Sequence, residues 1–180
     1  MTRVLERRTV EVADPGRVVT LLAPAARFVL RGDGAVMHAA GAIIGAMPST
    51  VACRAVSGQD WSALWQGPDE QLLLGPVKWQ AGFEAALETA LRELPHSLVD
   101  ISHRQVGIEL AGPRAATLLN AACPLDLDLA AFPAGMVTRT VFAKTEITLW
   151  RKAPEHFHIE VWRSYADYLI ALLNVAAESG

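Results

Sequence analysis

Three polar side chains near the middle of the chain, Asp100, Ser102 and His103, are the residue types of a hydrolytic triad. A triad works only if the three groups converge on one point. Residues 97–102 have the pattern of a strand, and in a strand Asp100 and Ser102 share a face while His103 points to the other. We therefore expect no nucleophilic catalysis here. Two interpretations stay open: a polar strand end whose side chains satisfy backbone groups, which we favour, and a contact with another protein.

A second group with chemical potential is the pair of imidazoles in His156-Phe157-His158, which lie on one face of a strand. Two imidazoles on one face can ligate a metal ion if a third ligand converges from elsewhere. The sequence offers no such cluster near them. We expect solvated or hairpin-packing histidines, and no metal ligands in this chain.

The segment Gly32-Asp33-Gly34 opens a predicted helix, as phosphate-binding turns do. It lacks the third glycine of the dinucleotide fingerprint and the lysine of a P-loop. A carboxylate at a helix start favours the helix dipole and repels phosphate, so we expect a tight turn with Asp33 at the helix start. The sequence thus predicts no catalytic and no cofactor-binding residues.

Tryptophan and arginine are enriched at protein interfaces, and two Trp-Arg pairs occur on neighbouring predicted strands. Guanidinium groups can also bind carboxylates of a partner chain. Core packing of the tryptophans and simple solvation of the arginines are the alternatives. The candidate interface residues are Arg104, Arg139, Trp150, Arg151, Trp162 and Arg163.

These side chains are positioned by an internal repeat, which covers about residues 26–95 and 97–178. RFVLRGDGAVMHAAGAIIG aligns with VGIELAGPRAATLLNAACP, so that Gly32 aligns with Gly112. ALWQGPDEQLLLGPVKWQAGFEAALETAL aligns with TLWRKAPEHFHIEVWRSYADYLIALLNVA, so that Trp65 aligns with Trp150, with one residue inserted in the second hairpin turn. Each half therefore predicts the same order of elements.

That order is β-α-β-β-α, with strands at 71–74 and 157–161 and an antiparallel sheet covered by helices on one face. We expect an α+β fold of two pseudo-symmetric, ferredoxin-like halves, linked by the strand at 97–102 with no flexible spacer. The chain would then be a single domain over residues 1–180. The apolar stripes of the two final helices include Trp79, Phe83, Leu87 and Leu91, and Tyr165, Tyr168, Leu169, Leu172 and Leu173.

Composition excludes some partners. The formal charge of −3 comes from 16 basic and 19 acidic residues with no basic run, so we expect no nucleic acid partner. From the N-terminal residues we expect no export signal, and from the apolar runs we expect no membrane span. Cys53 and Cys123 are expected to be reduced, buried thiols, which favours the cytoplasm. Hydrophobic content of 52% with 19% charged residues suggests that some apolar surface faces a partner.

Several motifs together resemble one family. SLVDISHRQVGIELAGPRAATLL resembles the folate-binding aminomethyltransferase fold of the glycine cleavage system. GPDEQLLL, VDISHRQ, CPLDLDLAAFPAGMVTRTVFAKTEITLWR and FHIEVWRSYADYL, in this order, are similar to the gamma subunit of heterotetrameric sarcosine oxidase. One departure is Gln71, where many relatives are expected to have an aromatic residue.

The resemblance implies a four-chain oxidase that demethylates sarcosine to glycine, passes the one-carbon unit to tetrahydrofolate and forms hydrogen peroxide. It assigns FAD, FMN, NAD and folate to other subunits, and to this chain a non-catalytic role in assembly with the alpha, beta and delta subunits. One alternative is a free-standing folate-binding or one-carbon-transfer protein, since fold does not settle function. Another is a homo-oligomeric scaffold, and we also expect the isolated chain to self-associate.

Overall fold

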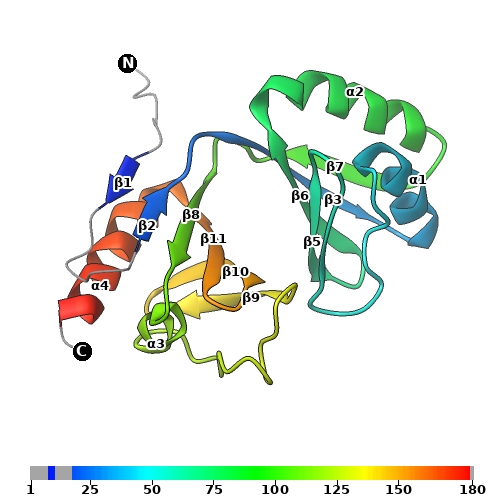
Figure 1. The fold of residues 1–180 in the computed structure, drawn as a ribbon. Coiled ribbons are helices and arrows are strands. Elements are labelled where there is room, and N and C mark those ends of the chain that lie inside the picture. The colour runs from blue at the N-terminus through cyan, green and yellow to red at the C-terminus, as the bar shows by residue number, and fades with distance from the viewer. Residues whose placement is uncertain (1–7, 11–17, 179–180) are drawn as a thin grey trace, which may run out of the picture. The chain divides into compact units, whose positions relative to one another are not determined.

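The computed structural model describes residues 8–10 and 18–178 (Figure 1). The chain divides into two compact units. We call Ala25–Ser102 the central unit, and Met1–Pro24 together with His103–Gly180 the outer unit. The outer unit is thus built from both ends of the chain, and each unit has its own sheet and its own hydrophobic core.

The central unit is a five-stranded antiparallel sheet with the strand order β4-β5-β6-β3-β7. Two helices and a short 3-10 turn, η1, complete it. The elements in chain order are β3 (Ala25–Gly32), α1 (Gly34–Ile44), β4 (Ala55–Ser57), β5 (Ser62–Gly67), β6 (Glu70–Pro76), η1 (Val77–Trp79), α2 (Gln80–Leu91) and β7 (His96–Asp100).

Local sequence signals fix the ends of α1. The Asp33 carboxylate accepts hydrogen bonds from the backbone N–H groups of Ala35 (2.9 Å) and Val36 (3.1 Å), which a helix start otherwise leaves unpaired. Gly45 ends the helix in the left-handed region at φ 79°, where glycine has no steric penalty. The tight turn and helix-start role expected for Asp33 are confirmed.

The outer unit is a six-stranded antiparallel sheet with the order β1-β2-β8-β11-β10-β9. A second 3-10 turn, η2, precedes its last helix. Its elements are β1 (Arg8–Val10), β2 (Val18–Leu21), β8 (Gln105–Ala111), α3 (Ala115–Asn120), β9 (Val137–Phe142), β10 (Thr145–Ala153), β11 (His156–Trp162), η2 (Arg163–Tyr165) and α4 (Ala166–Glu178). The strands predicted at 71–74 and 157–161 lie within β6 and β11, and the α+β class is confirmed.

Strand alternation gives the outer sheet two different faces. One face packs with α3 and α4 into the hydrophobic core, and includes Ile108, Leu110, Leu149, Arg151, Phe157 and Ile159. The opposite face, which we call the polar face, carries Glu109, Arg139, Thr148, Trp150, His158, Glu160 and Trp162.

The aligned glycines occupy equivalent turns. The N–H of Gly32 donates to the carbonyl of Asp69 (3.0 Å), and the N–H of Gly112 donates to the carbonyl of Glu155 (2.9 Å). Asp69 and Glu155 are themselves equivalent, because each follows a proline, Pro68 or Pro154, in the turn of the corresponding hairpin. Each glycine therefore joins the end of the first strand of its repeat, β3 or β8, to the central hairpin of the same sheet.

Two details of the expected topology are corrected. Each repeat has an additional strand, β4 or β9, ahead of its central hairpin, so its order is β-α-β-β-β-α, with β1, β2 and β7 outside it. The strand expected to link the halves, β7, pairs with β3 in the central sheet, while β2 pairs with β8 in the outer sheet. The boundary of the repeat thus lies between Ser102 and His103, and the single-domain organisation over residues 1–180 stays a prediction.

Two expectations from composition can be compared with the structure. Cys53 and Cys123 are both free thiols, but only Cys123 is buried, whereas Cys53 is half-buried. Among residues 8–10 and 18–178, no helix has the length and apolar character needed to cross a membrane.

Candidate interaction surface

A cation and an aromatic ring meet at one end of the outer sheet. Arg104 precedes β8, and Trp162 is the last residue of β11, where it pairs with Gln105. The backbone N–H of Arg163 also donates to the carbonyl of Arg104 (2.9 Å). With the two backbones tied in this way, the Arg104 guanidinium carbon lies 3.9 Å from the Trp162 ring centroid, a close cation–π contact.

The pair is the start of an exposed surface. Trp162 is 40% exposed, and Tyr165 in η2 and Tyr168 in α4 are also exposed. We define the aromatic patch as Arg104, Trp162, Arg163, Tyr165 and Tyr168, all of which are exposed. The expected burial of Tyr165 and Tyr168 on the helix stripe is wrong, because the core side of α4 is formed by Leu169, Ile170 and Leu173.

Two further candidates lie on the polar face of the outer sheet. Arg139 on β9 is exposed and pairs with Thr148 in the ladder. Trp150 on β10 is half-buried and packs edge-on against His158, with ring centroids 5.9 Å apart. The Trp150 indole N–H is buried and has no hydrogen-bond acceptor within the described part of the chain.

Arg151 does not belong with the exposed candidates. Its side chain is 2% exposed, and its guanidinium lies over the Phe157 ring at 4.6 Å. Alternation along β10 explains this, since Trp150 points to the polar face and Arg151 to the core side. A contact between Arg151 and a partner chain stays a prediction.

Arg151 instead holds a long loop in place. Its Nη1 donates to the carbonyls of Leu127 (3.1 Å) and Phe132, and its Nε donates to the carbonyl of Pro154 (3.2 Å). The first two carbonyls belong to residues 121–136, which connect α3 to β9. Burial lowers the pKa of Arg151, and the negative charge of Asp128 offsets part of this lowering.

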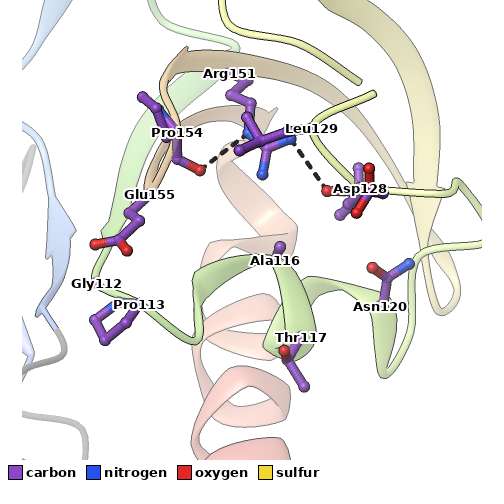
Figure 2. A pocket seen from close by; sticks show the side chains of 11 residues that line it. Gly112, Pro113, Ala116, Thr117, Asn120, Asp128, Leu129, Arg151, Pro154 and Glu155 are labelled. Carbon is purple, nitrogen blue, oxygen red and sulfur yellow. Dashed lines mark hydrogen bonds between the residues drawn. The ribbon is translucent and has the colours of Figure 1, made fainter. Parts of the chain in front are cut away.

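Beneath Arg151 lies an open pocket of about 400 Å³ (Figure 2). Figure 2 shows the Arg151 side chain above this space, with the carboxylates of Asp128 and Glu155 on opposite sides of it. All of its lining belongs to the outer unit: Gly112, Pro113, Ala116, Thr117, Asn120, Leu127, Asp128, Leu129, Arg151, Pro154 and Glu155. Residue types did not predict this pocket. The sequence feature that could have indicated it is the long loop CPLDLDLAAFPAG between two regular elements.

Asp100 and Ser102 form a polar strand end whose side chains bind backbone groups, which is the interpretation favoured from the sequence. Asp100 accepts hydrogen bonds from the backbone N–H of Ser102 (2.8 Å) and from the Gln80 side chain (2.7 Å). The Ser102 hydroxyl accepts the backbone N–H of Arg27 (2.9 Å). These polar groups therefore close a strand end and connect it to β3 and α2 of the central unit, as expected for the structural interpretation.

The two histidines of β11 have separate carboxylate partners. His158 Nε2 lies 2.7 Å from Glu160 in the interior, and His156 Nε2 lies 3.4 Å from Glu109, which also binds Lys152 at 3.0 Å. Burial raises the pKa of Glu109, but the Lys152 hydrogen bond and nearby positive charges outweigh it, so this pKa lies below its usual value. Within residues 8–10 and 18–178, no group of three His, Cys, Asp or Glu side chains could hold a metal ion.

Solved structures with a similar fold exist. The chain matches the heterotetrameric sarcosine oxidase from Corynebacterium sp. U-96 in complex with pyrrole 2-carboxylate, with a TM-score of 0.84 and 26% identity, over 93% of this chain and 88% of that one. It also matches aminomethyltransferase T of the glycine cleavage system from Bartonella henselae, with a TM-score of 0.66 and 14% identity, over 85% of this chain and 44% of that one. The second likeness is one of fold.

Proteins that are similar in sequence are also components of sarcosine oxidases. Sarcosine oxidase subunit gamma from Corynebacterium sp. (strain P-1) is 31% identical over 139 residues, which is 77% of this chain and 68% of that protein. The Arthrobacter sp. subunit gamma is 32% identical over 113 residues, or 63% of this chain and 55% of that protein. The family model for the sarcosine oxidase gamma subunit matches residues 31–179. The chain therefore belongs to the sarcosine oxidase gamma subunit family.

Proposed function

We propose that this chain is a non-catalytic assembly subunit of a heterotetrameric, cytoplasmic sarcosine oxidase. The similar chain of known structure comes from a heterotetrameric sarcosine oxidase, and the similarity extends over most of both chains. In this proposal the larger alpha and beta chains carry FAD, FMN, NAD and the tetrahydrofolate site, and the delta subunit completes the complex. They convert sarcosine to glycine, transfer the one-carbon unit and form hydrogen peroxide.

The aromatic patch is the observation that carries the proposal. Aromatic and arginine side chains supply most of the binding energy in protein interfaces, and here three aromatic rings and two guanidinium groups are exposed together. Arg104 covers one face of Trp162, so its N–H edges stay available for carboxylates or carbonyls of another chain. A partner that covers this patch would bury apolar area without leaving the cations unpaired.

The polar groups that most resemble catalytic machinery support the same proposal, because they are engaged in the fold. Asp100 and Ser102 bind backbone N–H groups, and a third polar side chain, Gln80, bridges toward both of them. His158 and Glu160 bind each other in the interior. A general base or nucleophile must reach a substrate, whereas these side chains are directed at the backbone and at neighbouring side chains of the fold.

The first experiment compares the purified chain with the complete oxidase. We expect the chain alone to be colourless, to form no peroxide from sarcosine and to bind no tetrahydrofolate by calorimetry. Its exposed patch should make it self-associate in light-scattering measurements. A flavin absorbance that survives purification, or peroxide formed by the chain alone, would overturn the non-catalytic role. Tetrahydrofolate binding by the chain alone would favour the folate-binding alternative.

A further inference from the structure

We propose that the pocket beneath Arg151 binds a small zwitterionic amino acid, with its carboxylate on Arg151 and its ammonium group between Asp128 and Glu155. The pocket lies entirely in the outer unit, and the aromatic patch contributes none of its lining. This proposal therefore does not depend on the assembly role. It concerns a ligand site that the chain would carry in addition to its contacts with other subunits.

The hydrogen bonds of Arg151 leave one side of its guanidinium without a partner. Nε and Nη1 donate to three backbone carbonyls, but Nη2 has no acceptor in the described part of the chain. In Figure 2 the guanidinium nitrogen without a dashed line points into the space above Ala116. An enclosed guanidinium with free N–H groups is costly to desolvate, and a carboxylate is the acceptor that matches its geometry best.

The carboxylates beside the pocket repel a ligand that carries only negative charge. Asp128 and Glu155 are exposed carboxylates at its sides, so the mouth carries more negative than positive charge. Asp128 already caps the turn at Ala130 through one oxygen (2.8 Å), whereas Glu155 has no side-chain partner within residues 18–178. A ligand with a carboxylate and an ammonium group can bind Arg151 with the first and Glu155 with the second. An amino acid carries both groups.

The pocket has room for a small amino acid, and its lining has both apolar and polar groups. About 400 Å³ lies at the lower end of the range for small-molecule sites. Pro113, Ala116 and Leu129 provide apolar contact, and Thr117 provides a hydroxyl group. We therefore expect glycine-like and other short aliphatic amino acids to fit.

The internal repeat provides a comparison within the molecule. In the central unit the residue at the place of Arg151 is Trp65, since Trp65 pairs with Gln71 as Arg151 pairs with Phe157. The two hairpin turns have the same length, so the residue expected to be inserted in the second turn is not there. The outer unit thus has a buried cation where the central unit has a half-buried, uncharged tryptophan. The fold alone does not require a charge at this position.

The test is a titration of the isotope-labelled full chain, followed by NMR. Glycine is the probe, and acetate and methylamine are the matched half-ligands. We expect glycine to shift the signals of Thr117, Asn120 and the Arg151 guanidinium at millimolar concentrations, with both half-ligands at least about tenfold weaker, since each lacks one charge-assisted contact. Binding of acetate as tight as that of glycine would overturn the zwitterion assignment. No site-specific shift with glycine at about 50 mM would overturn the site itself.

Variants separate the pocket from the fold. Glu155→Gln should weaken glycine binding by about tenfold and leave acetate binding equal or stronger. Ala116→Leu should abolish binding by filling the space without removing a hydrogen bond of Arg151. Glu146→Gln, which removes an exposed carboxylate elsewhere in the same unit, is the control and should change nothing. Unchanged glycine affinity in both pocket variants would refute the proposal.

Discussion

The guanidinium of Arg104 lies over the indole ring of Trp162 at 3.9 Å, where the end of β11 meets the start of β8. The contact uses one ring face and one guanidinium face, and 40% of the Trp162 surface stays exposed. Backbone pairing on both sides of the contact fixes its geometry in advance. A partner chain would then lose little side-chain entropy on binding this pair, which is how rigid anchors increase affinity.

The first prediction concerns Arg151 as the anchor of the loop 121–136. Arg151→Met should lower the free energy of unfolding by about 3 kcal/mol, because it leaves the carbonyls of Leu127 and Phe132 without their donor. Chemical denaturation measures this. Lys144→Met, at an exposed turn, should change stability by less than about 0.5 kcal/mol. Equal stability of the two variants would show that the loop does not depend on Arg151.

The second prediction concerns the start of α1. Asp33→Ala should cost about 1 kcal/mol of stability, because the N–H groups of Ala35 and Val36 lose their acceptor. Asp33→Asn keeps an acceptor oxygen and should cost much less. Thermal unfolding of both variants provides the measurement, and a larger loss with asparagine than with alanine would contradict the capping role.

The third prediction concerns pH. The pKa of Glu109 is lowered in the folded chain, so its contribution to stability is present above the unfolded pKa of about 4.3 and is lost as pH falls through the lower folded value. Glu109→Gln should therefore reduce the loss of stability on acidification. The effect is small, because the Lys152 partner is partly exposed and solvent screens the pair. Denaturation at several pH values should show no such change for Glu146→Gln.

The sequence predicted the parts of the fold that depend on local chemistry. Residue type alone predicts Asp33 at its helix start, and the alignment of Gly32 with Gly112 predicts their equivalent hydrogen bonds. The strand Ala55–Ser57 was missed because three residues are too short to show alternation. The partner of β7 was also missed, since which sheet a linking strand joins is decided by packing between distant segments.

The candidate surface was predicted in part. Residue type identified Arg104, Trp162 and Arg163, which are exposed. Residue type did not predict the burial of Arg151. As the neighbour of Trp150 on a strand, Arg151 faces the opposite side, and the carbonyls that offset the cost of its burial come from a loop remote in sequence. Helical periodicity correctly predicted that Leu169 and Leu173 lie in the core. It did not show where the buried face of the helix ends, so Tyr165 and Tyr168 were wrongly included.

The central claim, that the aromatic patch joins this chain to the larger subunits, is tested most directly by co-purification of the oxidase with variants of this chain. Trp162→Ala or Arg163→Glu should weaken assembly by about 2 kcal/mol or more, while Trp79→Ala, at an exposed tryptophan of the central unit, should assemble normally. Unfolding of each isolated variant separates lost contacts from lost stability. If both patch variants have normal stability and still co-purify with the alpha, beta and delta subunits at the wild-type yield and affinity, the account is contradicted.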